Sequence, residues 1–484
     1  MNPFLLRVAH SIACPSVLIT VLLTGCGPSV NRYALIEQNL LAGNPAQAAA
    51  VVEQAENEYG DKSRVLYGMD RGLTLQLAGD YRQSTAALEQ AEDVVERLYT
   101  RTIRSETAAF LTNDNALPYE GDAYEHVMLN VVKALNYAVQ GDVQEALVEA
   151  RRIDHRLNLL SDRVKESGGY RNDGFARYLS GILYEAAGDL NNAFIAYRNA
   201  FEAYEAMRGW SRVSPPPSLR ADVLCMAEAL GLATELDDYR KKFPDVAWKP
   251  ASSRRQLAQV VMISYNGRAP RKEDRFIDLP ISLDALQLVL LNRGLAQSSR
   301  YRDRAMDSVL YGLSGRVVRV ALPRLVSQKT QVPFETMTLT DAQGAPLAVQ
   351  SEPVHNLTAL AERSLDDRMP AITAKALARA ASKFALAEGA AIGAQRAAGR
   401  DAGPWVGLLV GMLAKGLAVA SEEADKRSWQ TLPDEIHMAR AWVPAGRYQL
   451  TIQPPGHRAS MEGGEHMLDL ASGQTAFILQ RVMQ

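Results

Sequence analysis

The chain contains 484 residues, of which 47% are hydrophobic and 22% are charged. Its 53 lysines and arginines nearly balance its 55 aspartates and glutamates, which gives a formal net charge of −2. This length predicts two or three domains, each large enough to bury a core. Because nucleic-acid binding needs a concentrated basic surface, the balanced charge argues against a nucleic-acid partner.

The N-terminal segment has the pattern of a lipoprotein signal. A charged start precedes an apolar run over residues 17–23, and residues 23–26 (Leu-Thr-Gly-Cys) form a lipobox. Because the apolar run is too short to span a bilayer, we interpret residues 1–25 as a secretory signal peptide that is cleaved before Cys26. Lipidation of Cys26 would anchor the mature chain to a membrane, and residues 26–32 would form the anchor and a short tether.

The three cysteines have different expected fates. Cys14 would leave with the signal peptide and Cys26 would carry lipid, so Cys225 would be the one free thiol of the mature chain. An intramolecular disulfide is then ruled out, and the fold must be stable through packing even in an oxidising compartment. The apolar stretch at 223–226 predicts that Cys225 is buried as a small hydrophobic residue and is not a nucleophile.

From residue 33 to about residue 250 the sequence repeats a helix, a Gly-Asn or Gly-Asp corner and a second helix. Glycine permits the tight turn between helices, and Asn or Asp can cap the helix that follows. A small residue about five positions after each glycine would let the paired helices approach closely. The corners lie at Gly43-Asn44, Gly79-Asp80, Gly141-Asp142 and Gly188-Asp189, and the small residues are Ala48, Ser84, Ala146 and Ala193. This pattern resembles the tetratricopeptide repeat (TPR) and predicts an all-α helical solenoid.

A stack of such helix pairs typically presents an extended groove to a peptide or protein partner. Tyr184 and Tyr197 could line that groove, or they could pack at repeat positions inside the array. We therefore treat both as candidate partner-binding residues, with core packing as the alternative. The proline run at 215–217 precedes a last helix pair over about 219–243, which we expect to cap the array.

Residues 251–484 differ in sequence pattern from the alanine-rich helices before them, because many segments alternate in polarity and contain β-branched residues. Strands are predicted at 257–265, 316–322, 334–339, 346–350, 437–443, 447–453 and 475–482. Asn266-Gly267 and Pro444-Ala445-Gly446 predict tight turns between strands. The pattern predicts a β-rich, sandwich-like unit, so the complete chain is expected to be an α+β multidomain protein.

A helical insertion over about 364–426 interrupts these strands. It starts as an alanine-rich helix and continues as the glycine-rich run 405–420. That run is too short to cross a bilayer, and its interior lysine would be costly in lipid. Two interpretations stay open: a helical hairpin buried through close glycine contacts, or a segment in which Trp405, Leu409 and Met412 contact a partner or lipid.

The sequence contains no catalytic, metal or cofactor motif that we can assign. Its histidines do not cluster, and the residues at 312–315 (Gly-Leu-Ser-Gly) lack the spacing of a nucleophile elbow. The charged stretch at 265–275 is interpreted as an exposed β-turn, with a substrate loop as the alternative. Trp429 follows another charged stretch, where it could turn the chain back into the sheet or anchor a partner. We therefore predict no enzyme activity, no metal and no cofactor.

Four features together resemble a largely uncharacterised group of TPR-bearing outer-membrane lipoproteins of Gram-negative bacteria: the lipobox, the degenerate repeats, and the stretches at 265–281 and 424–450. In such lipoproteins an aspartate directly after the lipidated cysteine is the usual signal for retention in the inner membrane. This chain has Gly27 at that position, so the outer membrane is expected. The resemblance implies a lipid-anchored envelope protein that faces the periplasm from the outer membrane, with a protein partner at its repeats. The expected function is a scaffold or assembly factor. One alternative is a regulator of peptidoglycan synthesis, and another is an envelope hydrolase or glycan-binding enzyme in the C-terminal half.

Overall fold

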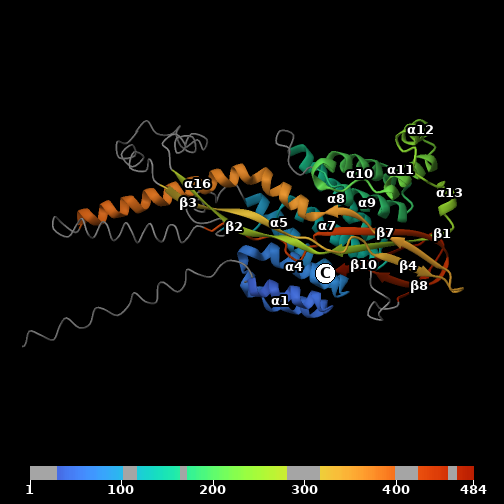
Figure 1. The fold of residues 1–484 in the computed structure, drawn as a ribbon, viewed down its shortest axis with the longest axis horizontal. Helices are drawn as coiled ribbons and strands as arrows, with labels where there is room; N and C mark the ends of the chain where they lie inside the picture. The colour runs from blue at the N-terminus through green and yellow to red at the C-terminus, as the bar shows by residue number, and fades with distance from the viewer. Residues whose placement is uncertain are drawn as a thin grey trace, which may run out of the picture.

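Figure 1 shows the computed structural model of the chain, which describes residues 30–101, 117–163, 172–280, 317–397, 423–455 and 466–483. The helices of the first half lie beside the strands of the second half, and a long helix extends from the body. The predicted α+β architecture, a TPR-like helical region followed by a strand-rich region, is confirmed. The lipobox with Cys26 and the run with Trp405, Leu409 and Met412 lie outside the described residues.

Consecutive helices of the described chain pair as antiparallel hairpins. The pairs are α1 (Val30–Leu41) with α2 (Pro45–Gln54), α4 (Arg64–Leu77) with α5 (Tyr81–Arg101), α7 (Ala123–Val139) with α8 (Val143–Arg163), α9 (Gly174–Ala186) with α10 (Leu190–Ser211), and α11 (Pro217–Ala229) with α12 (Ala233–Lys242). Short helices lie at α3 (Glu56–Tyr59), η1 (Asp61–Ser63) and α13 (Ala251–Arg254). Each pair packs on the next, since α2 contacts α4, α5 contacts α7, α8 contacts α9, and α10 contacts α11. We call α1 to α12 the helical array.

The helix corners form as the sequence predicts. The chain adopts a left-handed conformation, with φ between 69° and 81°, at Gly43, Gly79, Gly141, Gly188 and Gly231. After Gly79, the Asp80 N–H donates to the Leu75 carbonyl at 3.0 Å, which is the turn that commonly ends a helix at glycine. The Asp80 carboxylate then caps the next helix by accepting from the Gln83 N–H at 3.1 Å. Gly231 forms a further corner, which the Gly-Asn or Gly-Asp pattern does not predict because Leu232 follows it. The small residues that follow the predicted corners are all fully buried: Ala48, Ser84, Ala146 and Ala193.

The strands of the described chain form two four-stranded sheets and a two-stranded ribbon. The central sheet has the order β10-β1-β7-β6, with β1 (Leu257–Asn266), β6 (Glu352–Asn356), β7 (Glu435–Pro444) and β10 (Thr475–Val482). The outer sheet has the order β5-β4-β8-β9, with β4 (Thr336–Thr340), β5 (Pro346–Gln350), β8 (Gly446–Gln453) and β9 (His466–Leu470). The antiparallel ribbon consists of β2 (Arg268–Pro280) and β3 (Val317–Gln328). In the central sheet, β1 runs parallel to β10 and antiparallel to β7.

The central sheet lies between the helical array and the outer sheet, so the body has three layers. Val261, Ile263 and Tyr265 of β1 belong to the core shared with the helices, whereas Val260 and Met262 belong to the core shared with the outer sheet. All five side chains are fully buried. Burial on both faces explains the nearly continuous apolar run of β1. The predicted sandwich is therefore present, and its central sheet shares a core with the helices.

The two predicted turns lie between strands, as expected. β1 ends at Asn266 and β2 begins at Arg268, and β7 ends at Pro444 and β8 begins at Gly446. The two strands on either side of each turn do not pair with each other. Each turn instead passes the chain from the central sheet to the ribbon or to the outer sheet. The charged stretch at 265–275 is not an exposed turn, because most of it forms β2. β2 pairs with β3, which is distant in the sequence. The local pattern of charges does not reveal this pairing.

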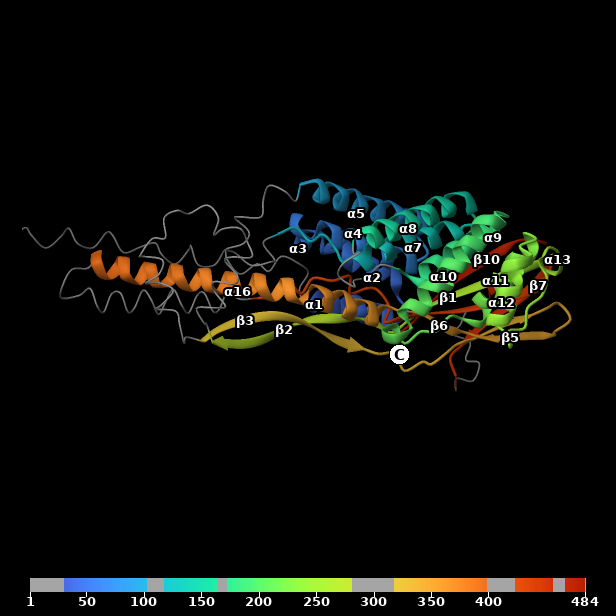
Figure 2. The same cartoon turned by 90° about the horizontal axis from the view of Figure 1, so that it is seen from above.

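The ribbon and α16 (Leu357–Ala397) form an arm that projects from the body (Figures 1 and 2). α16 starts at Leu357, earlier than the predicted start of the insertion near residue 364. Leu360 packs in the core that the helices share with the central sheet, whereas Met369 lies farther along α16 and packs with Val320 of the ribbon. The second helix predicted for the insertion falls outside the described residues. None of the helices in the described ranges is long and apolar enough to cross a membrane.

Candidate functional site

The inner face of the helical array is covered by the chain's own strands. The first helices of three pairs make these contacts: α4 and α7 contact β10, and α9 contacts β6. Figure 2 shows the helices lying along one side of the central sheet. In repeat proteins the concave face of the array is typically the binding surface. Here the face of α4, α7 and α9 that contacts the strands is covered by the central sheet in the part of the chain that the structure describes.

The two tyrosines predicted to bind a partner lie inside this packing. Tyr197 is fully buried, with its ring against Gly181 and edge-on to Tyr178. Its hydroxyl donates to Glu185 at 2.5 Å. Tyr184 is 5% exposed. These positions support the packing alternative, because a partner could contact either side chain only if the array opened.

A buried charge cluster joins the array to the central sheet. Arg440 of β7 is paired with Asp222 of α11 and donates to the Tyr178 hydroxyl at 2.7 Å. Arg254 of α13 donates to the same Asp222 at 2.8 Å and to Glu185 at 3.2 Å. Burial raises the pKa of Tyr178, so its phenol stays neutral beside these charges. Two guanidinium groups are thus balanced by two carboxylates, which is the condition for burying charge at low cost.

Trp429 forms part of a second junction between the two halves of the chain. Its side chain is 1% exposed, and its backbone N–H donates to Glu125 of α7 at 2.8 Å. Its indole N–H donates to Thr431 at 2.9 Å, and Thr431 donates to Asp70 of α4 at 2.8 Å. The structure therefore favours the structural-corner interpretation of Trp429. Access to its ring would require this junction to separate.

The two carboxyl groups at this junction hold protons more tightly than usual. Burial raises the pKa of Asp70 to about 6. Burial, together with the nearby charge of Asp122, raises the pKa of Glu125 to about 7. Removing a carboxylate from water disfavours its charged form, which explains both directions. Glu125 is therefore partly protonated near neutral pH.

Asp122 fixes the arm to the array. It pairs with Lys272 of β2 at 3.2 Å and with Arg368 of α16 at 2.5 Å. Burial alone would raise the pKa of Asp122, but the two cations hold it below its usual range. On the ribbon itself, Phe276 is 55% exposed. The arm thus has a fixed base and an exposed outer surface.

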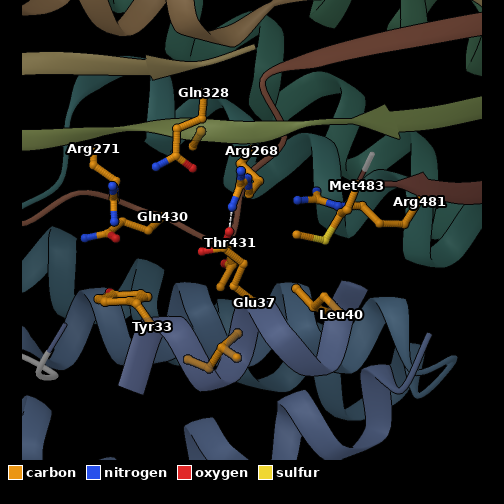
Figure 3. A pocket seen from close by; sticks show the side chains of 12 residues that line it. Tyr33, Glu37, Leu40, Arg268, Arg271, Gln328, Gln430, Thr431, Arg481 and Met483 are labelled. Atoms are coloured by element: carbon orange, nitrogen blue, oxygen red, sulfur yellow. Dashed lines mark ion pairs between the residues drawn. The ribbon is translucent and has the colours of Figure 1, made fainter. Parts of the chain in front are cut away.

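A small cavity lies where α1, the start of β2 and the end of β10 meet (Figure 3). Its volume is about 30 Å³. Arg268, Arg271 and Arg481 contribute to its lining, and Glu37 of α1 pairs with Arg268. These residues come from three distant parts of the sequence. Only the basic stretch at 265–275 could have signalled the site from the sequence, and it does not indicate which other residues join it.

Ser264, His437 and Cys225 are side chains of types used in catalysis, and all three are buried. Ser264 of β1 lies opposite His437 of β7, and His437 Nε2 is 3.4 Å from Glu435 Oε2. Ser264 is fully buried, and its hydroxyl donates to Asn266 at 3.0 Å. The predicted burial of Cys225 is confirmed, and burial raises the pKa of its thiol to about 12. Within the described ranges, no group of three or more His, Cys, Asp or Glu residues could hold a metal ion.

Comparison with known proteins gives distant structural likenesses. MamA from Desulfovibrio magneticus RS-1 is 14% identical with a TM-score of 0.28, over 45% of this chain and 91% of that chain. A Podosopora anserina kinesin light chain protein with nearly identical TPR-like repeats is 15% identical with a TM-score of 0.29, over 45% of this chain and 93% of its own. No family model matches the chain, and no curated protein matches it. At these scores the likenesses carry no functional argument, and the repeat architecture rests on the helix pairs themselves.

Proposed function

We propose that this chain is a lipid-anchored envelope protein that acts as a protein-interaction scaffold or assembly factor at the periplasmic face of the outer membrane. TPR-like arrays commonly serve as binding scaffolds. Because the central sheet covers the inner face of this array, the partner must bind elsewhere. The projecting arm is the observation that carries the proposal, since it extends away from the body and exposes the surface of its ribbon.

The arm is suited to binding an extended protein segment. α16 has 41 residues and is therefore about 60 Å long. The ribbon has two described strands, and each therefore has an edge without a described strand partner. Such an edge can accept an additional strand from another protein. The exposed ring of Phe276 adds apolar contact area on the same ribbon.

Photo-crosslinking in intact cells tests where the partner binds. A photoreactive amino acid at Phe276 is expected to capture a protein that mass spectrometry can identify. Met467 of the outer sheet is 60% exposed and provides a matched position on the opposite layer. Capture from Met467 but not from Phe276 would contradict the arm as the binding surface. Capture of a peptidoglycan synthase would select the regulatory alternative.

The lipid anchor is proposed from the sequence of the lipobox. Acylation of Cys26 would place α1 close to the membrane, because α1 starts at Val30. Growth with a clickable fatty acid should label the wild-type chain and leave Cys26→Ala unlabelled. Separation of inner and outer membranes then tests the location. Continued labelling of the variant would disprove the anchor without affecting the test of the arm.

A further inference from the structure

Arg481 is a half-buried cation, and no ion pair joins it to a carboxylate of the described residues. It lies on β10, where its Nη2 donates to the Gly267 carbonyl at 3.0 Å. Its Nε and Nη1 atoms are buried and have no hydrogen-bond partner among the described residues. Burial lowers the pKa of this guanidinium to about 10, so it still carries its charge at neutral pH. A desolvated cation with open donors is unfavourable unless an acceptor is supplied.

The cavity beside Arg481 is positively charged. Figure 3 shows Arg481 reaching into it from one side and Arg271 from the other, with Arg268 between them. The pairing of Glu37 with Arg268 balances one of these three cations. Gln328 and Gln430 also line the cavity and add uncharged polar groups. The lining therefore has a surplus of two positive charges and several hydrogen-bond donors.

The size of the cavity limits what it can bind. A volume of about 30 Å³ holds about two water molecules, which suits a small polar group and excludes a large ligand from its interior. The forked donors of arginine match the oxygens of a phosphate group. We propose that this cavity binds a phosphate group, with Arg271 at its mouth and the positive charge of Arg481 in its lining. The proposal is independent of the scaffold function.

Two sources can supply such a group: free inorganic phosphate and the headgroup of a phospholipid. α1 forms one wall of the cavity and also exposes apolar side chains, with Val30 77%, Leu35 42% and Leu41 54% exposed. Apolar residues beside a cationic site are typical of surfaces that contact lipid. The experiment therefore tests the two sources separately.

Thermal unfolding of the full chain in neutral detergent tests the site with inorganic phosphate as the probe. Phosphate should raise the unfolding midpoint in a saturable way relative to chloride at equal ionic strength, because it binds the folded state. Arg481→Gln should raise the phosphate concentration needed for half of this stabilisation at least about ten-fold, since it removes one of the positive charges that line the cavity. Arg82→Gln, at an exposed position of α5, should respond as the wild type does. Absence of a phosphate-specific shift in the wild type would overturn the proposal.

A second variant separates binding from folding. Arg271 is exposed, so Arg271→Gln should keep the circular dichroism spectrum and the unfolding midpoint in chloride while weakening the phosphate response. If Arg481 were only structural, Arg481→Gln would lower the midpoint in chloride and leave the phosphate response of the folded fraction unchanged. That result would overturn the site. A phosphate response that is unchanged in both Arg271→Gln and Arg481→Gln would also overturn it.

A soluble short-chain lipid distinguishes the two sources. If the site takes a lipid headgroup, dihexanoyl phosphatidylglycerol should stabilise the wild type at lower concentrations than inorganic phosphate does, and Arg481→Gln should remove that stabilisation. If the site takes free phosphate, the lipid should have no effect that depends on Arg481. Stabilisation by the lipid that persists in Arg481→Gln, with no response to phosphate, would place lipid binding elsewhere and reject the cavity.

Discussion

Glu125 shows how one buried residue can join parts of the chain that are far apart in sequence. Its carboxyl group accepts from the Tyr119 hydroxyl at 2.5 Å, from the Asp122 N–H at 2.8 Å and from the Trp429 N–H at 2.8 Å. The contacts to Tyr119 and Asp122 are local, and the sequence around Asp122 fits a capping box. The contact to Trp429 spans 304 residues. A single sequence predicts the cap but not this third partner.

The raised pKa of Glu125 predicts a pH-dependent stability. Burial and Asp122 raise the pKa, whereas Lys272 and the hydrogen bond from Tyr119 lower it, and the result is about 7 against an ordinary value of 4.5. Between these values the folded state binds more protons than the unfolded state, so the free energy of unfolding falls as pH rises. The loss amounts to at most about 3 kcal/mol and is complete above about pH 7. Urea unfolding across this pH window measures it.

Glu125→Gln separates this effect from other titrating groups. The variant cannot ionise at this position, so its free energy of unfolding should fall less steeply over the same pH window than that of the wild type. Glu96→Gln, at an exposed position of α5, is the control and should keep the wild-type slope. Equal slopes in the wild type and in Glu125→Gln would show that Glu125 does not hold its proton in the folded state.

At the scale of elements, close helix contacts depend on particular glycines. In the pair formed by α9 and α10, a Cβ atom added at Gly181 would lie 2.4 Å from Cδ1 of Tyr197. The same addition at Gly209 of α10 would meet nothing within 4 Å. Both glycines lie inside helices, where alanine has the better intrinsic propensity. The two positions therefore separate the effect of packing from the effect of helix propensity.

We expect opposite effects from alanine at these two positions. Gly181→Ala should lower the free energy of unfolding by about 1–3 kcal/mol, because the buried Tyr197 ring must move in a filled core. Gly209→Ala should raise it by about 0.5–1 kcal/mol, since it changes only helix propensity. Denaturant unfolding of the two variants measures both values. A stabilising effect of Gly181→Ala would show that the ring has room to move.

The elements predicted correctly are those with strong local signals. The glycine corners follow from backbone conformation, and the long strands β1 and β10 follow from their β-branched runs. The short strands β6 and β9 lack such runs and are missing from the sequence analysis. β2 is misread as a turn because its side chains are mostly charged, although distant residues neutralise them: Lys272 by Asp122, and Asp274 by Lys426.

At the scale of the whole molecule, the sequence predicts the helical and strand-rich regions but not their shared core. The secondary structure does change from helices to strands near residue 250, since α12 ends at Lys242 and β1 begins at Leu257. The core nevertheless continues across it, because one cluster of buried side chains includes residues of α4, α7, α9, β1 and β7. The covering of the inner face depends on contacts between residues hundreds of positions apart. Local periodicity contains no information about such contacts.

This shared core predicts that the two regions unfold together. Arg440 of β7 is buried against Asp222 of α11, so Arg440→Gln leaves a buried carboxylate with one cation, Arg254, in place of two. Breaking a buried ion pair typically costs about 3–5 kcal/mol, and the remaining arginine places the expected loss near the lower value. Far-ultraviolet circular dichroism can follow the helices, while hydrogen exchange of the β1 and β7 amides follows the central sheet. Both measurements should shift to lower denaturant concentration by the same amount.

Arg447→Gln is the matched control for this prediction. Arg447 forms an exposed ion pair with Asp469 of the outer sheet at 3.0 Å, so its loss should leave both transitions where they are in the wild type. Independent regions would behave differently, because Arg440→Gln would then shift the exchange of the central sheet and leave the helical transition in place. That result would mean that the helical array is stable without the sheet that covers it. Its inner face could then open to a partner, and the groove alternative for Tyr184 and Tyr197 would be the better one.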